Sequence, residues 1–333
     1  MISVTQFFRR PYPGAFSIER LYSDVRSGLS ESCRFNVSVC RRFSRGVWPR
    51  LTNMLEARHH QGDVNHVTGD VHYLSLLLPK ARTILTVHDL VLLERLRGWK
   101  YFAAWLFWYW LPVWRSSVVV AVSDTTRNAL IKTLRCDPAK IRVVNNCVSG
   151  EFYPAPKSYM PAVPRILQVG TGENKNLTRV VEALGGVACT LVIVGVLSEQ
   201  QRSCLNNHGV VFENYVGLQS SELVEEYVKS DLVVFASTFE GFGLPIIEAQ
   251  AVGRPVITSK VVPMCEVAGE DACLVDPFCV NSIRAGVARV LADHEYRNLL
   301  VKTGFSNVTR FSITHVAAEY EKIYREVASG LKN

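Results

Sequence analysis

The sequence of 333 residues lacks the motifs of several common enzyme classes. It has no Asp-x-Asp pair to bridge a metal ion and a diphosphate, no H-E-x-x-H zinc motif and no G-x-S-x-G hydrolase motif. No G-x-G-x-x-G follows the first expected strand, which argues against an NAD-dependent dehydrogenase. Internal repeats and low-complexity tracts are also missing. We therefore expect an enzyme or binding protein that works without a metal ion or cofactor.

Paired cysteines and long apolar runs are missing as well. The nine cysteines form no C-x-x-C pair and show no zinc-like spacing, which favours reduced thiols. In the first ten residues the two arginines follow the apolar run, the reverse of a secretory signal. The uncharged run from Tyr101 to Trp114 has 14 residues, whereas a bilayer span takes roughly 20. We expect a cytoplasmic protein, with peripheral contact at the inner face of the cytoplasmic membrane left open.

Positive charge is concentrated in the first half of the chain. The net charge is +7, to which residues 1–150 contribute +11 (21 Lys and Arg, 10 Asp and Glu) and residues 151–333 contribute −4 (16 and 20). Such asymmetry suggests a separate anionic partner for the first half, either nucleic acid, an anionic membrane surface or a phosphorylated acceptor. Because no RNA- or DNA-binding motif is present, we expect the membrane or the acceptor rather than nucleic acid.

Aromatic residues gather in the segment Trp99–Trp114, which holds five of the six tryptophans and is flanked by basic residues. Tryptophan and tyrosine favour the membrane–water boundary, so this segment is either an interfacial helix or a helix buried within the first domain. The basic stretch Arg34–Arg50 likewise suits either a solvated face or a membrane-facing patch.

Short apolar runs alternate with helical patterns along the whole chain, which predicts the α/β class with parallel sheets. The length suits two domains, and the proline-rich stretch from Pro154 to Pro164 is the best linker. We expect an N-terminal domain over 1–155, a C-terminal domain over 156–311, and a closing helix over 312–333 that packs back toward the first domain.

The most informative stretch is Phe239–Ala249, which follows a buried strand with a glycine loop and then a helix. Gly243 lets the backbone approach a ligand, and the N–H groups of Phe242, Gly243 and Leu244 sit at the positive end of the helix, where an anion binds. Two carboxylates frame this loop, and their natural partners are hydroxyls. We predict that Glu248 binds a ribose and Glu240 a sugar ring.

Three further candidate ligand contacts also lie in segments that directly follow an expected strand. The loop from Gly170 to Lys175 stands between a strand and a helix, which suits phosphate binding, but it does not match the P-loop of ATPases. His88 stands at the end of another strand, where ligands collect in parallel sheets. Gly14 lies in a loop between the first strand and its helix, a third candidate anion cradle.

Glu240 and Glu248, with Gly-Phe-Gly-Leu-Pro between them, resemble the E-x7-E motif of the retaining glycosyltransferases of family 4. The Thr-x-His-Asp element that contains His88 and the element from Gly170 to Lys175 extend the resemblance. The resemblance implies a GT-B fold, in which two Rossmann-like domains with parallel sheets face each other across a cleft. The N-terminal domain would bind the acceptor and the C-terminal domain the nucleotide sugar. The chain departs from the family pattern where Gly14 stands alone and where the loop before Lys175 has no arginine.

The resemblance also implies the roles of the site residues. Lys175, Gly170 and Gly14 would approach the donor diphosphate together with the amides of Phe242, Gly243 and Leu244, while Glu248 would hold the ribose. Glu240, Lys175 and His88 would act at the transferred sugar and the leaving group.

The function implied is transfer of a hexose such as mannose or glucose, with retention, from a UDP- or GDP-linked sugar. The acceptor would be a glycan or lipid-linked glycan in cell-surface polysaccharide or lipopolysaccharide synthesis. Two other classes remain open, a GT-B nucleotide-sugar epimerase and a non-catalytic homologue that recruits a partner to a membrane.

Overall fold

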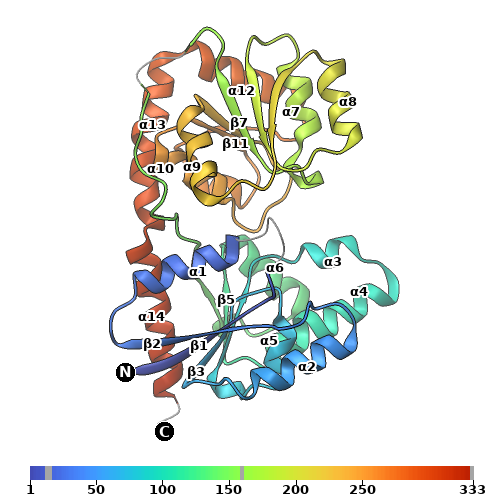
Figure 1. Cartoon of the computed structure of the whole chain (residues 1–333), viewed down its shortest axis with the longest axis vertical. Helices are drawn as coiled ribbons and strands as arrows, with labels where there is room; N and C mark the ends of the chain where they lie inside the picture. The colour runs from blue at the N-terminus through green and yellow to red at the C-terminus, as the bar shows by residue number, and fades with distance from the viewer. Residues whose placement is uncertain (12–16, 158–160, 331–333) are drawn as a thin grey trace. The chain divides into compact units, whose positions relative to one another are not determined.

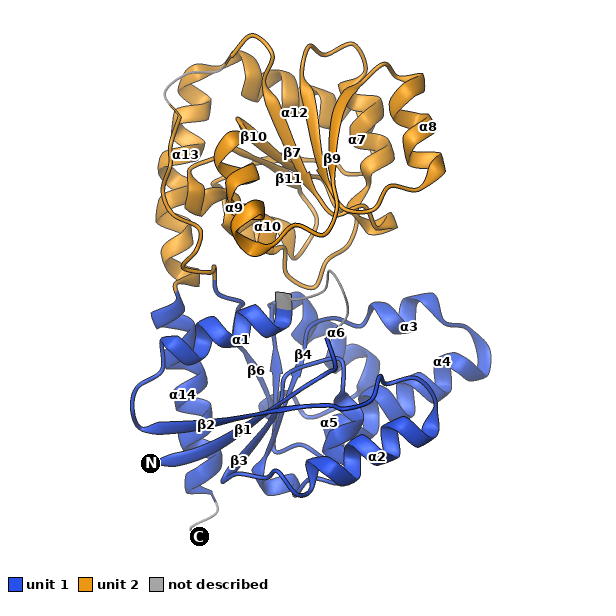
Figure 2. Cartoon of the chain, viewed as in Figure 1, with its two compact units in different colours: residues 1–147, 313–333 blue, residues 148–312 orange. Residues whose placement is uncertain are grey.

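The computed structural model describes residues 1–11, 17–157 and 161–330. The chain forms two compact units, unit 1 (residues 1–147 and 313–333) and unit 2 (residues 148–312) (Figure 1, Figure 2). From the sequence we placed the boundaries after residues 155 and 311. Residues 148–155 belong to unit 2 because Val148 donates its N–H to the carbonyl of Phe311 at 2.9 Å and Ala155 donates to Val252 at 3.0 Å.

Unit 1 contains a six-stranded parallel sheet in the order β2-β1-β3-β4-β5-β6. Its strands are β1 (Ile2–Phe8), β2 (Cys33–Val39), β3 (Val64–Val67), β4 (Thr83–Val87), β5 (Val118–Ala121) and β6 (Ile141–Val143). Its α-helices are α1 (Ser17–Ser27), α2 (Val47–Ala57), α3 (Val91–Arg95), α4 (Gly98–Ala104), α5 (Leu111–Trp114), α6 (Asp124–Leu134) and α14 (Ile313–Ser329). Short 3-10 helices are η1 (His72–Leu76), η2 (Lys80–Arg82) and η4 (Pro138–Lys140).

Both faces of this sheet are covered, as parallel sheets require. Successive residues of β1 point to opposite sides, so Val4 and Phe8 pack with α1 and α14, whereas Phe7 packs with α2, α5 and α6. The helix α6 begins as expected at Ser123, whose hydroxyl accepts the N–H of Thr126 at 3.1 Å.

The closing helix α14 is part of unit 1 and is fixed there by buried polar groups (Figure 2). The imidazole of His66 lies 2.8 Å from the Tyr324 hydroxyl through Nδ1 and 2.8 Å from the Thr86 hydroxyl through Nε2. Tyr22 bonds to the same Thr86 at 2.9 Å and to Tyr320 at 3.1 Å. The last helix of the chain thus completes the core formed by the first strands.

The segment Trp99–Trp114 is helical but not uniform, since α4 continues through a π-helical turn, η3 (Trp105–Trp110), into α5. Tyr109 is buried, and Trp108 packs against the core of unit 1. Trp99 and Phe102, in contrast, are 76% and 60% exposed. One part of the segment is therefore buried in unit 1 and another part is exposed, while contact with a membrane stays a prediction.

Unit 2 contains a second parallel sheet, in the order β12-β11-β10-β7-β8-β9. Its strands are β7 (Arg165–Val169), β8 (Thr190–Val194), β9 (Val211–Tyr215), β10 (Leu232–Phe235), β11 (Val256–Ser259) and β12 (Cys273–Val275). Its α-helices are α7 (Leu177–Leu184), α8 (Glu199–Asn207), α9 (Ser220–Lys229), α10 (Leu244–Val252), α11 (Met264–Ala268), α12 (Val280–Ala292) and α13 (His294–Val308). Two 3-10 turns are η5 (Glu173–Lys175) and η6 (Thr309–Phe311).

The apolar core of unit 2 joins one face of the sheet to α7, α8 and α12, while α10 contacts β10 and β11 beside α9 and α11. The predicted α/β class with parallel sheets is confirmed. Two details of the prediction were wrong. From the sequence, Ser282 was expected to precede a helix running to about His294, but it lies inside α12, and a separate helix, α13, begins after Asp293, whose carboxylate accepts the N–H of Tyr296 at 2.9 Å.

Candidate functional site

The candidate site of unit 2 is built at the carboxyl ends of β7 and β10, which are neighbours in the sheet although these ends lie 66 positions apart in the chain (235 − 169). The loop after β7 contains Lys175, and the loop after β10 contains Glu240. Ligands of open parallel sheets bind at such ends. The sheet order therefore brings the two predicted residues together.

Gly243 sets the geometry of the second loop. Its φ of 113° is accessible to glycine but strained for other residues, and it forms the N-cap of α10. The helix then runs from Leu244 to Val252 with Pro245 in its first turn, and ends at Gly253 with φ 79°. The positive end of a nine-residue helix thus lies at this loop, where it favours an anion.

Lys175 lies across the first loop with its ammonium group on Glu240. The Nζ–Oε1 distance is 2.7 Å, and Nζ also lies 4.7 Å from the ring centroid of Phe235. Gly170, with φ 92°, leaves room for this path, since a Cβ atom there would lie 2.9 Å from Cε of Lys175. The two side chains are only 22% and 14% exposed. The contact therefore unites a fixed cation with a carboxylate in partly desolvated surroundings.

Two asparagines that the sequence reasoning missed hold the loops in this arrangement. Asn174 donates from Nδ2 to Oε1 of Glu240 at 3.1 Å and to the carbonyl of Phe239 at 3.0 Å. Asn176, in the left-handed conformation with φ 59°, donates to Ala236 and Pro277 at 2.9 and 2.7 Å. The signal available was the Asn-Lys-Asn triplet, but its partners lie 60 or more positions away in the chain.

Glu248 is buried on α10, with 4% of its surface exposed. Its Oε2 atom accepts a hydrogen bond from the hydroxyl of Tyr227 on α9 at 2.7 Å. Tyr227 is itself fully buried, so it orients the carboxylate from within the core. Sequence reasoning did not identify Tyr227, because nothing local distinguishes it from a packing residue of an amphipathic helix.

The guanidinium of Arg254 is fully buried and donates hydrogen bonds to the backbone carbonyls of four residues, one of which is Tyr227. These are Ala155 and Val228 at 2.7 Å, and Tyr227 and Gly253 at 3.1 Å. Arg254 thereby fastens residue 155 to the ends of α9 and α10.

Among the remaining predicted positions, His88 belongs to unit 1 and follows β4. Its Nε2 atom lies 2.8 Å from the carbonyl of Thr68, and the absence of a side chain at Gly69 lets the ring fit, since a Cβ there would lie 2.6 Å from Cδ2. Gly14 lies outside the described residues. Leu244 is the first residue of α10, and the ring of Phe242 is buried 5.6 Å from that of Phe311.

The described residues contain no group of three or more His, Cys, Asp or Glu side chains that could hold a metal ion. Among the same residues, none of the helices combines the length and apolar character that crossing a bilayer requires. What the site of unit 2 does contain is a lysine, a helix amino end and two oriented carboxylates, a set suited to an anion that carries hydroxyl groups.

Comparison with protein families gives two matches that together span most of the chain. Residues 161–306 match the family described as "Glycosyl transferases group 1", and residues 8–152 match that described as "Glycosyltransferase Family 4". The two matched ranges correspond to unit 2 and unit 1, apart from α14 and the chain ends.

Individual relatives agree with this assignment at low identity. The chain is 24% identical to the O-antigen chain mannosyltransferase B of Escherichia coli over 63% of its own length and 61% of that protein. It is 34% identical to the D-inositol 3-phosphate glycosyltransferase of Corynebacterium glutamicum over 32% of its own length. The chain spans less than two thirds of the length of these relatives, and only 26% of the second.

Solved structures share the fold over nearly the whole chain. HepE of Anabaena, solved with UDP and glucose, has a TM-score of 0.80 at 14% identity, covering 98% of this chain and 100% of that one. A glycosyltransferase of Rickettsia africae reaches 0.77 at 17% identity, with 98% of each chain covered. WaaG, a glycosyltransferase of lipopolysaccharide biosynthesis, reaches 0.71 at 13% identity, covering 97% and 99%.

Proposed function

Since the chain belongs to the family 4 type of GT-B glycosyltransferases, we propose that it transfers a hexose with retention from a nucleotide diphosphate sugar to a glycan or lipid-linked glycan. The donor is UDP- or GDP-linked, and the product belongs to cell-surface polysaccharide or lipopolysaccharide synthesis. The observation that carries this proposal is the contact between Lys175 and Glu240 beside the amino end of α10.

The proposed donor site assigns each group a separate task. Lys175 and the amides of Phe242, Gly243 and Leu244 neutralise the diphosphate, whose negative charge grows as the sugar leaves. Glu240 accepts hydrogen bonds from hydroxyls of the transferred sugar, and Glu248, oriented by Tyr227, accepts them from the ribose. Gly170 allows the backbone to approach the phosphates.

The proposed chemical step needs no carboxylate nucleophile. The bond between the anomeric carbon and the diphosphate oxygen breaks, and the acceptor hydroxyl forms its bond to that carbon on the same face. The acceptor proton passes to the departing diphosphate, so charge and atoms balance. Catalysis then consists mainly of placement and of stabilising the leaving group, and His88 is proposed to contact the sugar.

Names of similar proteins support the donor and acceptor classes proposed. HepE is solved with UDP and, in another crystal, with UDP-glucose. Two Escherichia coli relatives are named as mannosyltransferases, one of the O-antigen chain and one serotype-specific. These names support a hexose donor and a polysaccharide acceptor.

A panel of UDP- and GDP-sugars tested by thermal shift identifies the donor. A ligand at 100 times its dissociation constant stabilises the folded protein by roughly 2.7 kcal/mol, which is readily detected. Transfer is then measured with the best donor. Conversion of the donor to an isomer without any acceptor would instead identify an epimerase and overturn the proposal.

The lysine assignment is tested by Lys175→Ala, which is expected to abolish transfer without unfolding the protein. The matched control is Lys302→Ala on α13, because that lysine is exposed and lies outside the site. Full transfer by the Lys175 variant would refute the site.

For location, we propose peripheral contact of unit 1 with an anionic membrane surface. Trp99 and Phe102 on α4 are exposed, and so is Trp48 on α2 at 79%. Arg45 and Lys100 are exposed close to them in the chain. Exposed aromatic residues beside cations are typical of interfacial binding.

Sedimentation with vesicles containing or lacking phosphatidylglycerol tests this contact. The double variant Trp48→Ser, Trp99→Ser is expected to reduce the bound fraction several-fold, because each exposed ring loses the apolar area that it would bury. Val211→Ser and Val216→Ser in unit 2 remove exposed apolar side chains elsewhere and serve as controls. Equal binding to both kinds of vesicle would contradict an electrostatic component.

A further inference from the structure

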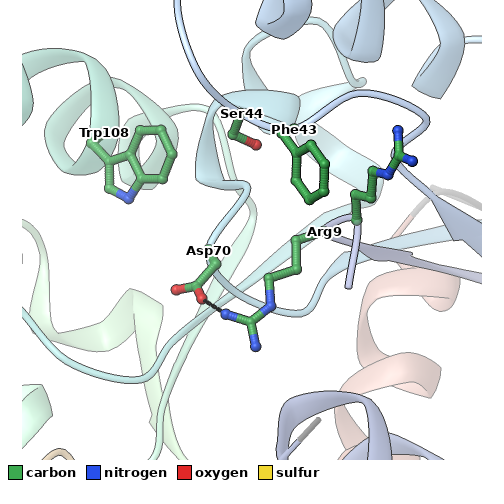
Figure 3. Close-up of a pocket in the computed structure, with 6 residues that line it drawn as sticks. Arg9, Phe43, Ser44, Asp70 and Trp108 are labelled. Atoms are coloured by element: carbon green, nitrogen blue, oxygen red, sulfur yellow. Dashed lines mark hydrogen bonds and ion pairs between the residues drawn. The ribbon is translucent and has the colours of Figure 1, made fainter. Parts of the chain in front are cut away.

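Unit 1 contains a pocket of about 210 Å³ at the carboxyl ends of β1, β2 and β3 (Figure 3). Its lining residues come from the segments after these strands and from the π-helical turn η3. They are Arg9 and Arg10 after β1, Phe43 and Ser44 after β2, Asp70 after β3, and Trp108 in η3. The sheet order β2-β1-β3 brings these segments together.

Positive charge in the pocket is provided chiefly by Arg10. Its guanidinium lies 4.5 Å from the ring centroid of Phe43 and donates to the carbonyl of Arg41 at 2.9 Å. Arg10 forms no ion pair with any residue in the described ranges, so its charge is not neutralised by a carboxylate. A second cation, Arg50, stacks on Trp108 with 5.0 Å between guanidinium and ring centroid.

The other arginine of the pocket is engaged differently. Arg9 pairs with Glu19, at 3.3 Å, and with Asp70. This pairing reduces the repulsion that the Asp70 carboxylate would exert on an anion in the pocket. Asp70 remains half exposed, so its oxygens are accessible to a hydroxyl donor.

Two aromatic rings complete the pocket, and Figure 3 shows Phe43 and Trp108 on either side of Ser44. Tyr73 packs against Trp108, with 5.5 Å between the two ring centroids, and the Tyr73 hydroxyl forms a hydrogen bond with the Ser44 hydroxyl at 2.8 Å. The electron-rich face of such a ring packs well against the weakly positive C–H groups of a sugar.

We propose that this pocket binds the acceptor through a phosphate group attached to a saccharide ring. A guanidinium fork is suited to phosphate oxygens, an aromatic face to the ring, and a carboxylate to its hydroxyls. The pocket is smaller than the roughly 300–1,000 Å³ of sites for drug-sized ligands, which limits it to about one phosphorylated sugar unit. The assignment as an acceptor site rests on the proposed transferase function.

Calorimetric titration tests the binding itself, in the presence of saturating UDP so that phosphates do not fill the donor site. The probes are inorganic phosphate, glucose and glucose 1-phosphate. Arg10→Gln is expected to weaken binding of phosphate and of glucose 1-phosphate roughly 10- to 100-fold, the usual effect of losing hydrogen bonds to a charged group. Phe43→Leu is expected to weaken glucose 1-phosphate binding about 2- to 10-fold while changing phosphate binding less than about twofold.

The control is Arg34→Gln, which removes one exposed arginine at the opposite end of β2 and should leave all affinities unchanged. If Arg34→Gln lost as much affinity as Arg10→Gln, the effect would come from overall charge, and the proposal that this pocket binds the phosphate would be overturned. Glucose binding as tightly as glucose 1-phosphate to the wild-type protein would also overturn it.

A fourth probe, farnesyl diphosphate linked to glucose, distinguishes the two sources of such a phosphate. Binding of both phosphorylated sugars, each weakened by Arg10→Gln, identifies the phosphosugar itself as the ligand. Binding of the prenyl compound alone, weakened in the same variant, identifies a lipid-linked sugar. If wild-type protein binds no UDP and transfers no sugar, the transferase proposal fails, whereas the pocket is still judged by the difference between Arg10→Gln and wild type.

Discussion

The two units share one architecture, a six-stranded parallel sheet between helices, yet some of their cations have different partners. In unit 2, Arg165 contacts Glu213 at 3.0 Å and Glu226 at 3.1 Å, and Lys157 contacts Asp231 at 2.7 Å. In unit 1, Arg10 and Arg50 lie on aromatic rings instead. Both units also contain ion pairs and cation–ring contacts elsewhere, so the contrast is local: Lys175 at the site of unit 2 is paired with Glu240, whereas Arg10 in the pocket of unit 1 has no carboxylate partner among the described residues.

The largest expected effect comes from removing the carboxylate that holds this lysine. Glu240→Ala should lower the rate of transfer by roughly 10²- to 10³-fold, the scale observed when one group that stabilises a transition state is removed. Binding of UDP, measured by thermal shift, should persist because Lys175 remains.

The exposed Glu225 provides the control, since Glu225→Ala removes the same charge from the surface of α9. An unchanged transfer rate for Glu240→Ala would show that the site of unit 2 takes no part in the reaction. The difference between the two units would then concern their charges only.

A smaller effect is expected from the buried guanidinium of unit 2. Arg254→Met should destabilise the protein by about 3 kcal/mol, because four carbonyl groups lose their donor in the interior. Urea unfolding followed by circular dichroism measures the loss. Arg284 also donates to two carbonyls, at 3.0 Å each, but is exposed, so Arg284→Met should cost less than about 1 kcal/mol. Equal losses in the two variants would show that burial of Arg254 contributes nothing.

Acid should also separate the units, through two buried histidines of unit 1. Burial lowers the pKa of His66 from 6.5 to about 3, and burial lowers that of His72 to about 4. The unfolded chain therefore binds more protons than the folded chain below pH 6.5. Stability is fully present above pH 6.5 and is lost as the pH falls toward the folded values, by about 2 kcal/mol at pH 5 for His66.

Both histidines of unit 2, His208 and His294, are exposed. Hydrogen exchange of peptides, corrected for intrinsic rates, should therefore show loss of protection in unit 1 before unit 2 between pH 6.5 and 5. His66→Gln should flatten this dependence in unit 1. Simultaneous loss of protection in both units would contradict the assignment to buried imidazoles.

Local signals predicted the elements of the fold well. Apolar runs indicated the strands, and the glycine loop followed by a helix within Phe239–Ala249 was predicted correctly, since Gly243 has a φ of 113° and α10 begins at Leu244. The start of α12 was misplaced, and α13 was missed although Asp293 caps its start, because a single capping residue between two helical stretches does not by itself indicate a break. Periodicity and backbone preference act over a few residues, so they can be read from the chain directly.

The candidate site was only partly predictable. Lys175 and Glu240 were proposed separately from their own loops, and both were assigned to one ligand through a family resemblance rather than through contact. Asn174, which donates to Glu240, and Tyr227, which donates to Glu248, were not foreseen, because a polar side chain in a loop or on a helix has no local sign of what it will contact.

The sequence by itself determined where strands, glycine turns and helix starts occur, since these depend on neighbouring residues and on backbone torsion. The tertiary structure alone decided that Lys175 meets Glu240, that Arg254 is buried, and that three strand ends form a pocket around Arg10. The physical reason is the order of the sheets: β10 pairs with β7, and β1 lies between β2 and β3, so contacts between distant segments follow from strand order.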